Sequence, residues 1–145
     1  MTREQTIKEI REARAAGNDT LVSLRNAQQL LNSAGNWGLL DMFGGGLLSG
    51  MMKHSKLSQA NNQMEQARAR IRSFQKELQD INVPGSFGVN VSDFLVFADF
   101  FFDGLIADWM VQSKISEAKM QVNQAIEKVG RILNDLDNWE RQALG

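Results

Sequence analysis

The chain carries a single proline, Pro84, and long stretches on either side of it place apolar residues in alternating steps of three and four. Because an α-helix completes a turn every 3.6 residues, this spacing gathers the apolar side chains on one side of a helix. Proline interrupts such a pattern most strongly, since it lacks an amide hydrogen and clashes with the preceding turn. The sequence therefore predicts an all-α fold built from long helices.

The first predicted helix begins at Thr2 with a capping-box pattern, because Gln5 follows three residues later. The run 17–19 (Gly-Asn-Asp) could interrupt it, but the apolar phase continues through the glycine, so one continuous helix is expected. Gly35 is expected to end the helix, since glycine is common just after a helix C-terminus. The predicted seam consists of Ile7, Ile10, Arg14, Gly17, Leu21, Leu24, Gln28 and Leu31.

Two further stretches have a more regular apolar spacing. The earlier one, which Pro84 ends, comprises Leu57, Ala60, Met64, Ala67, Ile71, Phe74, Leu78 and Ile81. The later one comprises Ile115, Ala118, Val122, Ala125, Val129, Ile132, Leu136, Trp139 and Ala143. Ile126 and Leu133 widen the apolar stripe of the later stretch. A wide stripe is typical of a helix covered on two sides, as in a bundle.

Between these stretches, residues 83–91 are expected to be extended and to lead back along the bundle. Ser92 is expected to cap a Phe-rich helix, and Asp93 suits the positive end of its dipole. The predicted fold is an elongated antiparallel bundle of three long helices plus a Phe-rich fourth helix, with a Gly-rich packed connection at one end. Residues 1–145 are expected to form a single helical-bundle domain.

Composition narrows the function classes. The chain has no cysteine, one histidine, and a net charge of −1 from 16 basic and 17 acidic residues. Thiol chemistry is therefore excluded, and a nucleic-acid partner is not expected, since such proteins are usually basic. The most apolar run, 94–111, holds Asp99, Asp103 and Asp108, each of which would cost roughly 3 kcal/mol at a bilayer centre. A membrane-spanning segment is therefore not expected, and the absence of a signal-like apolar run at the start favours a cytoplasmic location.

One end of the predicted bundle is unusually apolar. The Gly-rich connection, Gly35–Met52, carries one charged residue, Asp41, and should meet the Phe-rich segment Phe94–Met110 there. A connection exposed to solvent is normally polar, so this one is expected to be packed. We call this region the apolar end; its candidate interface or packing residues are Trp37, Met42, Phe43, Gly44, Gly45, Gly46, Met51 and Trp109.

The charged residues near the apolar end form a candidate cluster of Asp41, Lys53, His54, Asp99, Asp103 and Asp108. One interpretation is structural, with ion pairs and helix caps that fix the end of the bundle. The other is a site in which His54 and two or three carboxylates bind a divalent metal ion or a small cationic ligand. No catalytic motif is present, so no catalytic residue and no cofactor are predicted.

Two segments together, NWGLLDMFGGGLLSGMMKHSK (Asn36–Lys56) and FLVFADFFFDGLIADWMVQSKI (Phe94–Ile115), resemble a group of uncharacterised small helical proteins from bacteria. The resemblance covers about a third of the chain. It implies that the two segments act as one unit, and it implies no activity and no functional residue.

The leading functional hypothesis is a non-enzymatic helical bundle that acts by protein association, with a homo-oligomer or a helical protein as partner. Its basis is three heptad-patterned helices together with the apolar end. The first alternative is binding of a small ligand or divalent metal by the Asp/His cluster. The second is reversible association with a membrane surface, which the aspartates disfavour because anionic headgroups repel them.

Overall fold

A computed structural model of the chain describes the backbone of residues 2–42, 47–81, 83–101 and 115–145. Within these ranges the side chains of 33–42, 47–58, 60, 61, 86, 87, 89, 100, 101, 115 and 116 are outside the description. The described elements are α1 (Arg3–Met42), α2 (Leu47–Asp80), α3 (Gly85–Phe101) and α4 (Ile115–Leu144). The predicted all-α fold is confirmed.

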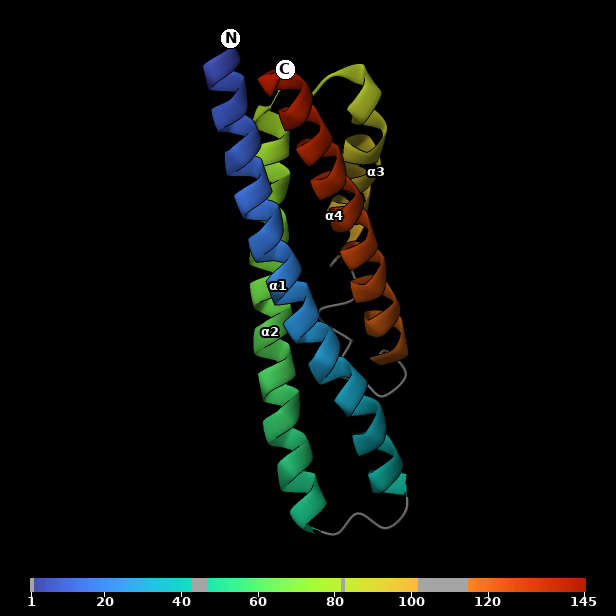
Figure 1. Cartoon of the computed structure of the whole chain (residues 1–145). Helices are drawn as coiled ribbons and strands as arrows, with labels where there is room; N and C mark the ends of the chain where they lie inside the picture. Colours follow the sequence, from blue (N-terminus) through green and yellow to red (C-terminus); the bar gives the residue numbers. More distant parts are fainter. Residues whose placement is uncertain (1, 43–46, 82, 102–114) are drawn as a thin grey trace.

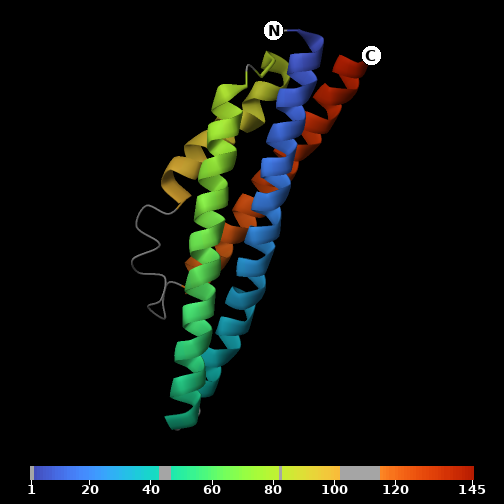
Figure 2. The same cartoon turned by 90° about the vertical axis from the view of Figure 1, so that its left-hand side faces the viewer.

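The helices form an elongated bundle in which α1 packs against both α2 and α4 (Figure 1). Polar contacts establish that α1 and α4 are antiparallel, since Gln28 Nε2 donates to Asn123 Oδ1 at 2.7 Å and Arg14 reaches Glu140 near the other end. The two chain termini lie at the same end of the molecule (Figure 1). The shorter α3 lies beside the part of α2 nearest that end (Figure 2) and also packs on α4.

The start of α1 agrees with the prediction. The amide of Gln5 donates to Thr2 Oγ1 at 3.1 Å and the amide of Thr2 donates to Gln5 Oε1 at 2.9 Å, which is a complete capping box. The helix continues through Gly17, as expected, but it also continues through Gly35 to Met42. The predicted end at Gly35 is wrong, because a glycine inside a helix costs only about 1 kcal/mol, which is too little to end a helix of 40 residues.

The connection between α1 and α2 is also shorter than predicted. Because α2 begins at Leu47, the predicted Gly-rich connection over 35–52 reduces to residues 43–46. The two helices run on past the first residue of α4 toward this connection (Figure 1). The expected packing of the Gly-rich segment on the Phe-rich segment falls outside the described residues.

The core follows the predicted seams of α2 and α4. Its buried members there are Met64, Ala67, Ile71, Phe74, Leu78, Ile81, Ala118, Val122, Ala125, Val129, Ile132 and Leu136. On α1 the seam is shifted by one residue at alternate positions and consists of Ile10, Ala13, Gly17, Thr20, Leu24, Ala27 and Leu31; Ser23 is buried beside it. The predicted Arg14, Leu21 and Gln28 are half-buried at its flank. The reason is that α1 lies between two helices, so small side chains occupy its closest approaches.

The prediction for residues 83–91 is wrong. These residues are not extended, because α3 begins at Gly85, and Ser92 lies inside the helix rather than at its cap. Pro84 directly precedes the helix, a place where its fixed φ and missing amide hydrogen are tolerated. Each valine that suggested an extended segment lowers the stability of a helix by only about 0.5 kcal/mol relative to alanine. Burial of Val91 in the core compensates for that cost.

All four helices meet where Phe94 of α3 enters the core. Its ring packs on Phe74 of α2, with centroids 5.3 Å apart and planes inclined by 53°. A Cβ added to Gly17 of α1 would lie 3.0 Å from two carbons of the Phe74 ring and 2.7 Å from Leu133 Cδ2 of α4. The absence of a side chain at Gly17 therefore allows α1 to approach α2 and α4 closely.

Candidate functional site

The predicted Asp/His cluster is not assembled in the described part of the structure. Asp99 is the one member whose side chain is described; it is exposed and accepts a hydrogen bond from Gln75 Nε2 at 2.8 Å. Gln75 follows His54 on α2 by 21 residues, about 32 Å along a helix. Asp99 and His54 therefore do not share a site.

The other predicted site residues stay predictions. The backbone places Asp41 on α1 and both Lys53 and His54 on α2, but their side chains are outside the description. The same holds for the apolar-end residues Trp37, Met42 and Met51. Seven further residues fall outside the described backbone altogether: Phe43, Gly44, Gly45, Gly46, Asp103, Asp108 and Trp109.

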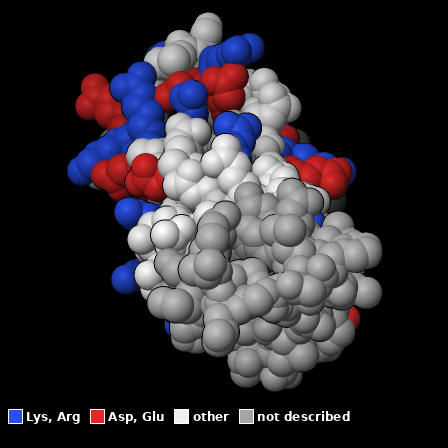
Figure 3. All heavy atoms as spheres, turned by 90° about the horizontal axis from the view of Figure 1, so that it is seen from below, with Lys and Arg blue, Asp and Glu red and all other residues white. Residues whose placement is uncertain are grey.

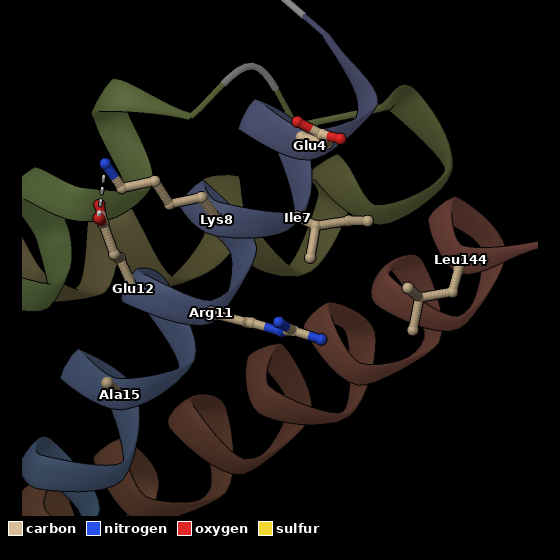
Figure 4. A pocket seen from close by; sticks show the side chains of 7 residues that line it. All are labelled: Glu4, Ile7, Lys8, Arg11, Glu12, Ala15 and Leu144. Atoms are coloured by element: carbon tan, nitrogen blue, oxygen red, sulfur yellow. Dashed lines mark ion pairs between the residues drawn. The ribbon is translucent and has the colours of Figure 1, made fainter.

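A surface groove lies at the opposite end of the bundle, beside the two termini (Figure 4). Its volume is about 550 Å³. Six of its lining residues belong to the first part of α1, and the seventh is at the end of α4. They are Glu4, Ile7, Lys8, Arg11, Glu12 and Ala15 on α1 and Leu144 on α4. We call this the α1 groove. The groove was not predicted from the sequence, because Ile7 falls in the predicted core seam and the pattern around Ala15 and Leu144 indicates no role for them.

The α1 groove is apolar at its floor and charged at its rim. Ile7 is half-buried, Ala15 is exposed and Leu144 is 50% exposed, and the side chains of Ile7 and Leu144 extend toward the space between the two helices (Figure 4). Lys8 Nζ lies 4.0 Å from Glu12 Oε1 along the rim. Apolar surface of this kind inside a ring of charges is typical of a contact area for another molecule.

Ion pairs hold α1 against α4 behind the groove. Arg11 Nε and Arg14 Nη1 donate to the two carboxylate oxygens of Glu140 at 2.8 and 2.7 Å. The Glu140 side chain is 11% exposed. Asp137 adds contacts at 3.5 Å to Arg14 and at 2.9 Å to Arg141. Since each charge in this network has a partner, its role is to fix the relative position of the two helices.

Carboxylates of α1 and α2 form the one described group whose donor atoms suit a metal ion. Oxygens of Glu9, Glu12 and Glu77 all lie within 4.8 Å of one another. Three carboxylates could hold a hard divalent cation such as Mg²⁺ or Ca²⁺. However, Glu12 is exposed and Glu9 and Glu77 are only half-buried, and acidic groups at a surface often lie together without a cation. This cluster was not singled out in the sequence, because its members come from two helices.

A second groove, of about 400 Å³, lies between α3 and α4. Lys128 lies inside it, with Nζ 2.6 Å from Asp93 Oδ2 and 5.3 Å from the centroid of the Phe97 ring. Arg131 and Glu127 form another ion pair in the same groove. These charges neutralise one another, so the groove has no free charge of one sign to attract an ionic ligand.

Charge is mixed elsewhere too. Seen from the end of the bundle opposite the termini, basic and acidic side chains are interspersed over the described surface, without an extended patch of one sign (Figure 3). Among the helices that the structure describes, none combines the length and the apolar character needed to cross a membrane.

No family model matches the chain, and no curated protein or solved structure shows significant similarity to it.

Proposed function

We propose that the protein is a non-enzymatic helical-bundle protein that acts by associating with another protein through the α1 groove. The observation that carries this proposal is the apolar floor of the groove, which the folded chain leaves open to solvent beside a charged rim. A cytoplasmic location and a helical partner, either a second copy or a different protein, are parts of the same proposal.

The shape of the groove suits a helix. Its α1 residues run from Glu4 to Ala15, about 17 Å along the helix axis. A partner helix of three turns would therefore cover it and would anchor its apolar residues at helical spacing. The long stems of Lys8 and Arg11 add apolar surface, while the ammonium of Lys8 stays at the rim and the guanidinium of Arg11 pairs with Glu140. Charges at the rim would set the register of the partner rather than supply most of the affinity.

Site-specific photo-crosslinking tests the proposal in cells that express the full chain. A photoreactive amino acid replaces Ala15, which is exposed in the groove, and in a matched control it replaces Ser73, which is exposed on the outer side of α2. We expect a covalent protein adduct from position 15 and none from position 73. Equal adduct formation at both positions, or none at either, would refute association through the groove.

A further inference from the structure

We propose that the occupant of the α1 groove is α1 of a second copy of this chain, antiparallel to the first and related to it by a two-fold axis at Ala15. The inference rests on the proposed function and deepens it by naming the partner. A two-fold arrangement uses the same surface on both subunits, so each favourable contact occurs twice. The surface must therefore be complementary to itself, and the exposed side of α1 meets that condition in three respects.

The first respect is the match between apolar side chains. With Ala15 on the axis, residue n of one copy lies level with residue 30 − n of the other, to within about one helical rise of 1.5 Å. Val22, which is 59% exposed, then comes level with Ile7 and Lys8 of the second copy, inside the groove. Val22 lies seven residues after Ala15, so two helical turns place both on the same side of α1. The pair would cover the one large apolar side chain that is exposed among the described side chains of α1.

The second respect is charge. Glu4 comes level with Arg25 of the second copy, and both residues lie on the same flank of the paired helices. Both are exposed, and neither forms an ion pair with another described residue. Glu12 and Asp19 also come level and repel each other, but Lys8, already 4.0 Å from Glu12, lies next to both. The net result is an attraction between the two α1 helices in this register.

The third respect is the small size of the side chain at the crossing point. Ala15 is the smallest exposed residue in the groove, and a small residue at a crossing point lets two helices approach closely. The four charged residues that line the groove, Glu4, Lys8, Arg11 and Glu12, sum to zero charge. A neutral groove gives no long-range attraction to an anionic lipid surface or to nucleic acid. A second copy of the chain therefore fits the groove better than either.

Cysteine crosslinking tests the register directly, because the natural chain has no cysteine. Ala15→Cys places two thiols beside the two-fold axis, whereas the control Ser73→Cys places them on the outer side of α2. Under mild oxidation of the purified full chain we expect Ala15→Cys to form a disulfide-linked dimer at least about tenfold faster than the control, since a disulfide needs the two Cβ atoms within about 4.5 Å. Equal rates for the two variants would overturn the proposal.

Charge exchange provides a second, independent test by sedimentation velocity. We expect Arg25→Glu to raise the dimer dissociation constant about tenfold, because it turns two attractions into two repulsions. Adding Glu4→Lys should restore the affinity of the natural chain. The control Arg72→Glu, on an exposed position of α2, should leave it unchanged. Failure of Glu4→Lys to restore dimerisation, in a variant with the natural helix content, would overturn the proposed register.

The two proposals fail in distinguishable ways. Suppose that the purified chain is a monomer at a subunit concentration of about 100 µM, well above the dissociation constant of a dimer with a standard-size interface. If position 15 still gives a photo-adduct with a different protein, the second copy is refuted and association through the groove is retained. If position 15 gives no adduct, both proposals are refuted.

Discussion

Replacement of Gly17 by alanine is expected to destabilise the protein, although alanine is the better helix former. Gly17 is buried where α1 packs against side chains of α2 and α4. An added Cβ would lie 2.7 Å from Leu133 Cδ2 and 3.0 Å from two ring carbons of Phe74. The first contact can relax, because Leu133 is half-buried and Cδ2 is at the end of its side chain. The second cannot relax easily, because the Phe74 ring is buried and packed on Phe94.

The magnitude follows from two opposing terms. Alanine gains about 1 kcal/mol over glycine inside a helix. Overpacking a core in which one neighbour cannot move costs about 2 kcal/mol. We therefore expect Gly17→Ala to lower the free energy of unfolding by about 1 kcal/mol, equivalent to a fall in Tm of roughly 3 °C for a chain of this length.

Gly130 provides a matched control inside α4. A Cβ added there meets no atom within 4 Å, so only the helix-propensity term applies. Gly130→Ala should raise the free energy of unfolding by about 1 kcal/mol, which separates the two variants by about 2 kcal/mol. Urea denaturation followed by far-UV circular dichroism measures both. If Gly17→Ala stabilises the protein as much as Gly130→Ala does, the close approach of the helices at Gly17 is refuted.

Three further substitutions test other contacts, each by urea denaturation. Glu140→Gln should cost about 1 kcal/mol, because Arg11 and Arg14 lose an ionised acceptor, and the loss should shrink in high salt; an equal loss at all salt concentrations would contradict this. Thr20→Val should also cost about 1 kcal/mol, since the buried hydroxyl contacts two backbone carbonyl oxygens, at 2.8 and 3.0 Å; a neutral result would mean that this hydrogen bond adds no net stability. Phe94→Ala should cost about 3 kcal/mol by leaving a cavity beside Phe74, and a loss below about 1 kcal/mol would show that α3 does not depend on this ring.

The sequence predicted the helices best where each has one clear apolar side. The predicted seams match the buried residues from Met64 to Ile81 on α2 and from Ala118 to Leu136 on α4, whereas Trp139 and Ala143 are half-buried. The seam of α1 was displaced at alternate positions, because α1 packs on both of the other long helices, whereas α2 and α4 each pack on α1 and on the shorter α3. A helix covered from two directions buries small residues such as Ala13, Thr20 and Ala27, while Arg14 and Gln28 form hydrogen bonds to α4 from the flank.

Element boundaries were less predictable, for local reasons. Gly35 and the valines of 83–91 are weak helix formers, but their penalties of about 1 kcal/mol or less are too small to end a helix. Val91 is the clearest example, because it lies in the helix that begins at Gly85 and is buried in the core there.

The structure separates Asp99 from His54 for a topological reason, whereas the other members of the predicted cluster stay predictions. The sequence suggested that the whole Phe-rich segment lies at the Gly-rich end of the bundle. Instead its described part packs beside Phe74 and Gln75, far along α2 from His54. The α1 groove was not predictable from the sequence either, since Ile7 and Leu144 lie near opposite ends of the chain. One sequence signal was present, the seven-residue spacing of Ala15 and Val22 on an otherwise polar side of α1.

Native mass spectrometry of the untagged, purified protein tests the two-fold pair of α1 helices most directly. We expect a species of twice the 16.2 kDa chain mass, with no additional mass from a metal ion or small molecule. Ala15→Glu should return it to a single chain, because two carboxylates would then face each other at the two-fold axis. A single-chain mass for the natural protein at every concentration, or a dimer that Ala15→Glu leaves intact, would contradict the account.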